Sequence, residues 1–114
     1  MSPFEIARAC HVINQAICVA IGDKTQPSWE EAPIEIREST IRGVTAVLEN
    51  PQVTPEEQHE AWRKYRTEAG WVYGETLDRE KKIHPDLKPF AELPVEHRVK
   101  SAVFIGTVNA LRDR

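Results

Sequence analysis

The sequence has no long hydrophobic run and no cluster of basic residues. No apolar stretch approaches the roughly 20 residues that a helix needs to cross a bilayer, so we expect no membrane partner. Lys and Arg total 15 against 18 Asp and Glu, which gives a formal net charge of −3. Because no run of positive charge could follow a phosphate backbone, we expect neither DNA nor RNA as a partner.

Cysteine is scarce, and its two copies cannot pair with each other. Cys10 and Cys18 lie eight residues apart in one predicted helix. That spacing is about 12 Å of helical rise, beyond the reach of a disulfide. Residues 1–5 also lack the basic segment and cleavage site of an export signal. We therefore expect reduced, largely buried thiols and a cytoplasmic protein.

Sequence motifs of catalysis, and metal ligands at typical spacing, are absent. There is no nucleophile elbow, P-loop, dinucleotide-binding glycine motif or CxxC pair. His59 and Glu60 begin like a zinc-protease helix, but position 63 holds Arg in place of the second ligand. The sequence therefore predicts no enzyme, no metal and no cofactor. Convergence of the histidines in space stays open, as does a small hydrolase with His11, His59 or His84 as its base.

The remaining composition is typical of one soluble domain spanning residues 1–114, with 40% apolar and 29% charged residues. Start and stop signals predict four helices, over about residues 3–22, 33–50, 54–70 and 94–111. Ser2 and Thr54 each begin a capping box with Pro at the first helical position. The last helix carries apolar residues on more than one face, which calls for a second partner surface, inside the domain or across a dimer.

Glycines and prolines punctuate the rest of the chain. Gly43 lies inside the second predicted helix, where close packing, a ligand near the backbone, or simple tolerance would explain it. Between residues 70 and 93 the helical period disappears. Residues 70–74 (GWVYG) are β-prone, and two prolines extend residues 83–90. We predict a mainly α fold with a small two-stranded ribbon packed on the helices.

Residues 59–98 carry motifs that resemble a known family. They are H-x-x-W at 59–62, GWVYG at 70–74, H-P-x-L at 84–87, and Leu93-Pro94 before the last helix. Their order and spacing are similar to those of the ryanodine-receptor (RyR) repeat domain. The N-terminal half, with ACH at 9–11 and WEEAP at 29–33, resembles the single-domain versions of bacteria and phages. The resemblance covers nearly the whole chain and implies a small helical fold.

The resemblance also implies partners and a ligand. In the calcium channels two repeats pack about a pseudo-twofold axis, so a stand-alone repeat is expected to form a homodimer. The channel pair is associated with adenine nucleotides at its seam, and the corresponding stacking residue here is Trp62, one turn after His59. Two departures stand out: Asp86 occupies a place where the family often has Cys, and the phosphorylated loop of the channels is missing. Regulation by phosphorylation is therefore not carried over.

The residues themselves offer the same candidates, each beside a structural alternative. Trp62 lies among Arg63, Lys64 and Arg66, which suits a stacked base with its phosphates near cations, or else it packs in the core. Trp71 and Tyr73 alternate and should share one face of a strand, facing either core or pocket.

Polar side chains add a second group of candidates. Lys82 and His84 could donate hydrogen bonds to an anionic ligand. Alternatively, Lys82 is solvated and His84 is hydrogen-bonded to a buried backbone carbonyl. His11 and Asn14 share a helix face and suit one ligand or one buried network. Trp29 is expected to close the hydrophobic layer over the first two helices.

Two functions follow as hypotheses. The leading one is a non-catalytic module that binds a nucleotide or nucleotide-derived signal at a dimer seam. The ligand would be an adenine nucleotide, a cyclic nucleotide or a relative of cyclic ADP-ribose, and the protein a sensor or sequestering protein in bacterial–phage defence conflict. The alternative is a protein-interaction module with an aromatic interface and no small-molecule ligand.

Overall fold

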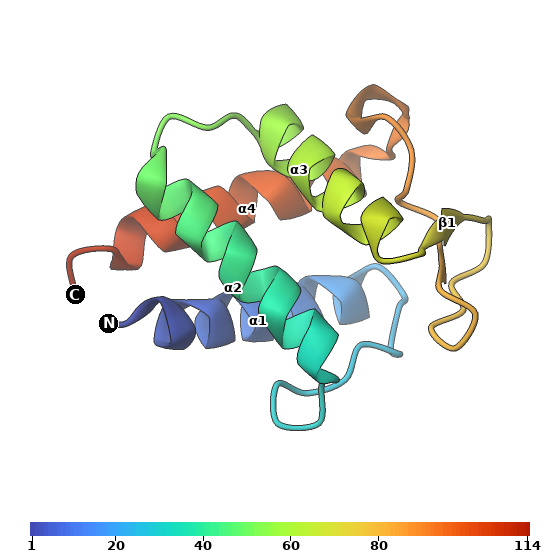
Figure 1. Ribbon diagram of the computed structural model, residues 1–114, viewed down its shortest axis with the longest axis horizontal. Coiled ribbons are helices and arrows are strands. Elements are labelled where there is room, and N and C mark those ends of the chain that lie inside the picture. Colours follow the sequence, from blue (N-terminus) through green and yellow to red (C-terminus); the bar gives the residue numbers. More distant parts are fainter.

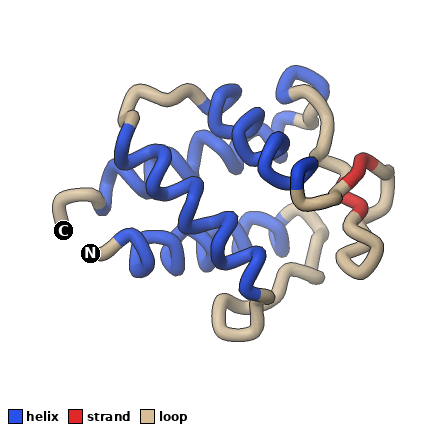
Figure 2. Tube along the Cα trace, in the orientation of Figure 1, coloured by secondary structure: helices blue, strands red, loops and turns tan.

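The computed structural model describes residues 1–114 and contains all four predicted helices (Figure 1). They are α1 (Pro3–Ala20), α2 (Ile34–Glu49), α3 (Pro55–Glu68) and α4 (Val95–Leu111). Figure 2 shows that helices make up most of the chain, so the prediction of a mainly α fold is confirmed. None of the helices combines the length and the apolar character that a bilayer crossing requires.

Both predicted capping boxes are formed. The Ser2 hydroxyl accepts a hydrogen bond from the Glu5 amide at 3.2 Å, and the Glu5 carboxylate accepts one from the Ser2 amide at 3.0 Å. Thr54 and Glu57 make the same reciprocal pair at 3.1 and 2.9 Å. These bonds satisfy amide groups that would otherwise lack partners at the helix starts, and they fix where α1 and α3 begin.

The main core lies where α1, α2 and α4 pack together. Its centre is apolar, with Val44, Val47 and Val108 fully buried. Trp29, from the loop between α1 and α2, closes this core with 4% of its surface exposed, as predicted. Both cysteines are free and buried, which is also as predicted. Burial raises the pKa of the Cys10 thiol to about 12, so this sulfur stays protonated at neutral pH.

Close packing of α2 against α4 accounts for Gly43. A Cβ atom at this position would lie 3.0 Å from the ring of Phe104. A contact this tight would push the Phe104 ring away by a few tenths of an ångström, so glycine is the residue that fits without any shift.

The predicted ribbon is present, and its two strands run parallel. Strand β1 (Val72–Tyr73) pairs with β2 (Ile83–His84), and a one-turn 3-10 helix, η1 (Phe90–Glu92), follows before α4. The connection turns back on itself, because Asp78 and Ile83 exchange two backbone hydrogen bonds of 2.9 Å. Gly74 is required here, since a Cβ would lie 2.3 Å from a methyl of Ile83.

Candidate functional site

A solvent-open cavity of about 700 Å³ is lined by residues of all four helices and of segments around residues 22–26 and 75–86. Its volume is within the range of small-molecule sites in proteins. Five of the eight residues singled out from the sequence line it, although they come from three separate parts of the chain: His11, Asn14, His59, Trp62 and His84.

Trp62 stands in an aromatic group on one wall of the cavity. Its ring centroid lies 5.1 Å from that of His84, edge to face, and 5.5 Å from that of His59. Trp62 is only partly buried, so some of its indole surface remains open beside the cavity. This arrangement offers an aromatic surface to a flat ligand.

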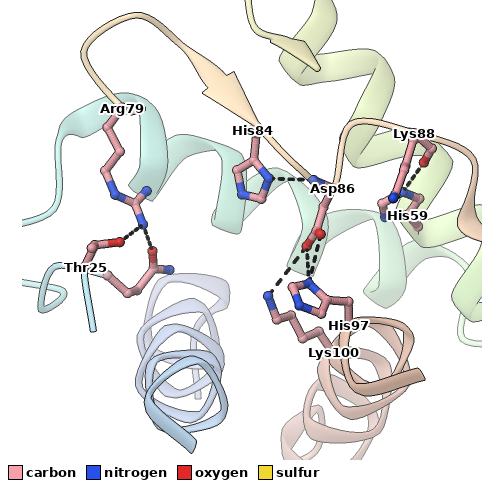
Figure 3. Close-up of polar contacts among 9 residues, drawn as sticks. Thr25, His59, Arg79, His84, Asp86, Lys88, His97 and Lys100 are labelled. Carbon is pink, nitrogen blue, oxygen red and sulfur yellow. Dashed lines mark hydrogen bonds and ion pairs between the residues drawn. The ribbon is translucent and has the colours of Figure 1, made fainter. Parts of the chain in front are cut away.

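Two of the lining histidines anchor loops through their Nε2 atoms. His11 donates to the carbonyl of Pro27 at 2.7 Å, and His59 donates to the carbonyl of Lys88 at 2.9 Å (Figure 3). Because a carbonyl only accepts, each Nε2 must carry a proton. Both rings therefore line the cavity, but their Nε2 donors bond to loop carbonyls and not to a ligand.

His84 is held as a neutral imidazole. Its Nδ1 accepts a hydrogen bond of 3.0 Å from the amide of Asp86, which requires that this nitrogen be unprotonated. The pKa of His84 is lowered to about 4, mainly by burial. Asp86 opposes this lowering, and the charges of Lys100, Arg66 and Arg79 add to it.

A buried carboxylate joins the loop to α4 at the base of the cavity. Asp86 accepts hydrogen bonds from His97 Nδ1, with its two oxygens at 2.8 and 3.0 Å, and lies 3.6 Å from Lys100 Nζ (Figure 3). Burial tends to raise the pKa of Asp86, but the His97 bond and the Lys100 charge outweigh it and hold the pKa below its usual value. The carboxylate therefore stays ionised at neutral pH.

Arg66 is a guanidinium that forms no ion pair within 4 Å. It lies 4.9 Å from the ring centroid of Trp71 and 5.7 Å from that of Trp62. Its buried Nε makes no hydrogen bond, and burial lowers its pKa. Arginine remains charged at neutral pH even so. Glu35 forms no ion pair with Arg66, but its charge acts on the guanidinium and partly opposes the effect of burial on the pKa.

Arg79 supplies a second cation that forms no ion pair, although its charge lowers the pKa of nearby Asp23. Its Nη2 donates to the side-chain oxygen of Gln26 at 2.8 Å and lies 3.5 Å from the Thr25 hydroxyl, so it ties the loop after β1 to the loop after α1 (Figure 3). This role cannot be predicted from the sequence, because Arg79 lies in a charged run that is typical of a solvated loop. Predicting it would require knowing that the loop after β1 and the loop after α1 lie side by side.

Three other candidates do not line the cavity. Trp71 precedes β1 and is 3% exposed, whereas Tyr73 is 50% exposed beneath the ammonium group of Lys88. The expectation that Trp71 and Tyr73 share one face is therefore wrong, because the strand begins only at Val72. Lys82 turns away from the cavity and donates to the carbonyl of Ala69 at 3.0 Å.

Metal-binding geometry is also missing, since no three His, Cys, Asp or Glu side chains gather closely enough to hold an ion. The lining groups include an aromatic face and the buried hydroxyl of Ser101. They also include the guanidinium groups of Arg42, Arg66 and Arg79 and the carboxylates of Asp23, Glu57, Glu75 and Asp86. Within this mixed lining, the aromatic face beside Arg66 is suited to a flat molecule that carries negative charge.

The comparison with known families agrees with the motifs of the sequence. The family model described as the RyR domain matches residues 31–108. This range includes the lining residues of α2, α3 and α4 and of the segment that joins α3 to α4. Helix α1 lies before the matched range. A comparison with curated proteins gives no match for this chain. Because the matched range covers well over half of its length, the chain belongs to the RyR domain family.

Proposed function

We propose that this RyR domain is a non-catalytic binding module for a nucleotide or nucleotide-derived signal. The observation that carries the proposal is the pairing of Trp62 with Arg66 on the wall of one cavity. An aromatic face and a cation that forms no ion pair match the two parts of a nucleotide, a flat base and an anionic phosphate.

The base is assigned to Trp62. Stacking of a base on an aromatic side chain contributes about 1–3 kcal/mol and tolerates different bases. His59 and His84 flank the indole at 5.5 and 5.1 Å, so a purine entering the cavity would meet aromatic rings from α3 and β2. This supports a purine ligand over a purely aliphatic one.

The phosphate is assigned to Arg66, with Arg79 as its neighbour. Burial of the Arg66 charge is costly and mainly the field of Glu35 opposes that cost, so an anionic ligand in direct contact would relieve it further. Arg79 acts electrostatically on Arg66, and both act on His84, which indicates that the three groups are near one another. The family resemblance implies a ligand at the seam of two repeats, whereas the cavity that supports our proposal lies within one chain.

Binding rather than catalysis is supported by how the polar groups are already used. His11 and His59 donate to loop carbonyls, and Asp86 is shared between His97 and Lys100. A nucleophile paired with an oriented base is the usual signature of hydrolytic sites. His97 is oriented by Asp86, but no serine, threonine or cysteine is hydrogen-bonded to it among the contacts of the chain.

The cellular role completes the proposal. The single-domain relatives of bacteria and phages that this sequence resembles suggest a cytoplasmic homodimer that senses or sequesters a signal in defence conflict. Adenine nucleotides, cyclic nucleotides and relatives of cyclic ADP-ribose are the ligands to test first. The concave cavity of about 700 Å³ favours this function over an aromatic protein-interaction surface, which would be flatter.

The first test is a thermal-shift screen with mononucleotides, cyclic nucleotides and cyclic ADP-ribose. A ligand at 100 times its Kd stabilises the native state by about 2.7 kcal/mol, enough to raise Tm by several degrees. Absence of any shift across this panel would contradict the proposal.

The second test assigns the two halves of the site by titration calorimetry with adenosine, AMP and ADP. Trp62→Ala should weaken all three, by about 5- to 150-fold, which corresponds to the loss of one base stack. Arg66→Gln should weaken AMP and ADP while leaving adenosine unchanged. Tyr73→Ala and Arg63→Gln are the matched controls, because Tyr73 is exposed and Arg63 is paired with Glu60, and neither lines the cavity.

A further inference from the structure

One row of side chains along α3 lines the cavity with an amide, an indole ring and a guanidinium. Gln58, Trp62 and Arg66 follow one another at intervals of four residues, which places them on the same face of the helix. All three belong to the cavity wall. The proposed function assigns Trp62 to the base and Arg66 to the phosphate, and Gln58 has no part in it.

The side-chain amide of Gln58 is unused within the chain. Gln58 forms hydrogen bonds only through its backbone, whose N–H donates to the Thr54 carbonyl at 2.9 Å. Its side chain is half-buried, and neither of its polar atoms is among those closed off from solvent without a partner. In contrast, the amide oxygen of Gln26, which also lines the cavity, already accepts from Arg79 at 2.8 Å. The Gln58 amide therefore keeps its donor and its acceptor available to a molecule in the cavity.

Gly43 of α2 lies across from this amide. The Gln58 Nε2 atom is 3.9 Å from the place that a Cβ would take at Gly43, and both residues line the cavity. Because glycine has no side chain, residue 43 leaves the amide uncovered on the side of α2. The position of Gly43 thus serves the opening of the cavity as well as the packing of Phe104.

The order of the row decides which part of a nucleotide would meet Gln58. Consecutive members of the row are about 6 Å apart along the helix axis, and all three side chains lean toward the N-terminal end of α3, so their order is kept. The Arg66 guanidinium accordingly lies 5.7 Å from the ring centroid of Trp62. A base stacked on Trp62, with its phosphate on Arg66, has its sugar side directed toward Arg66. The opposite edge of the base, which is farthest from the sugar, is then directed toward Gln58.

A primary amide is complementary to a base edge that has a donor beside an acceptor. Adenine has such an edge away from its sugar, where glutamine can bind the 6-amino group and N7 with two hydrogen bonds. Guanine has two acceptors, O6 and N7, at the same edge, which would leave the amide oxygen facing an acceptor. We propose that Gln58 selects the base, with its oxygen accepting from the 6-amino group of an adenine and its nitrogen donating to the neighbouring ring nitrogen. This role rests on the proposed function, because it requires the base to stack on Trp62.

The experiment compares AMP with purine riboside 5′-monophosphate, which has hydrogen in place of the 6-amino group, by titration calorimetry of the full chain. The two molecules share their phosphate, sugar and ring system, so Trp62 and Arg66 contribute equally to both. Wild type should bind AMP about 5- to 150-fold more tightly, which is the discrimination that one bidentate pair provides. Gln58→Met should bind both molecules as wild type binds the analogue, because methionine is of similar length and favours helices but cannot donate a hydrogen bond. Gln52→Met is the matched control and should keep the preference, since Gln52 is exposed and does not line the cavity.

The possible outcomes separate the role of Gln58 from the proposed function. Equal binding of the two molecules by wild type overturns the role of Gln58 and leaves the nucleotide site standing. A preference for AMP that persists in Gln58→Met overturns it too, as does an equal weakening of both molecules, which would mean that Gln58 supports the shape of the site. A wild type that binds neither molecule overturns the proposed function and the role of Gln58 with it. Circular dichroism checks that the variants are folded, and Gln58→Ala gives the same comparison if Gln58→Met is not.

Discussion

Acid should destabilise this protein through His84, and His84→Gln should remove that effect. In the folded chain His84 is enclosed beside Trp62 and Trp71, and its Nδ1 accepts the amide hydrogen of Asp86. Protonation of His84 would place a positive charge in this buried environment and break the hydrogen bond from the Asp86 amide. Glutamine keeps a polar side chain of similar reach and cannot take up the proton.

The size of the effect follows from the two pKa values. Burial lowers the pKa of His84 to about 4 in the folded chain, against about 6.5 in an unfolded one. Between these values the unfolded chain binds more protons, so the free energy of unfolding falls as the pH is lowered from 6.5 toward 4. From pH 7.5 to 5.0 the His84 contribution to this loss is about 2 kcal/mol.

Urea denaturation of both proteins at pH 7.5 and 5.0 measures this contribution. With an m value of about 2 kcal/mol/M, the wild-type midpoint should fall by about 1 M more than that of His84→Gln. Both pH values lie above the usual range of carboxyl groups, which limits their contribution to the difference. Equal falls in the two proteins would refute the reasoning, as would an NMR titration that places the His84 pKa near 6.5.

Three further substitutions test the ribbon, the buried carboxylate and a helix cap. Gly74→Ala should cost about 1–3 kcal/mol of unfolding free energy, because the added Cβ would lie 2.3 Å from a β-branched methyl of Ile83; an unchanged urea midpoint would contradict this packing. Asp86→Asn should cost about 3–5 kcal/mol at pH 7, since it leaves Lys100 without its carboxylate. Because the pKa of Asp86 is lowered on folding, its stabilisation is present above pH 4 and lost below it, so the two proteins should converge in acid denaturation. Thr54→Ala should cost about 1 kcal/mol in thermal or urea unfolding, and a cost near zero would mean that α3 does not depend on its capping box.

The local features of this protein follow from its sequence, because they depend on near neighbours. The Ser2 and Thr54 capping boxes connect residues three apart, so the starts of α1 and α3 could be predicted. The separation of Cys10 from Cys18 follows from helical rise alone. Trp29 could be placed against the core because it is a large apolar side chain beside two apolar helix faces. The family could also be recognised, since its motifs lie in order along one segment.

The cavity depends on contacts between residues far apart in the sequence. Gln26 and Arg79 are 53 positions apart, and His59 bonds the carbonyl of Lys88 29 positions away. No periodicity connects such pairs, because loops take their paths from the helices on which they pack. Arg79 was therefore missed as a lining residue, and Lys82, three positions later, was placed in the site although it points away from it.

The ribbon shows the same division between local and tertiary causes. The β-prone residues between two glycines were enough to predict a strand near Tyr73, but not its partner direction or its first residue. The chain turns back through the two Asp78–Ile83 backbone hydrogen bonds, and the strands that follow this turn run parallel. Trp71 is buried beside Arg66 and His84, so it does not share a strand face with Tyr73. The sequence by itself thus determined the helices, their caps and the family. Only the tertiary structure decided which side chains meet in the cavity, because that depends on how the helices and loops pack in space.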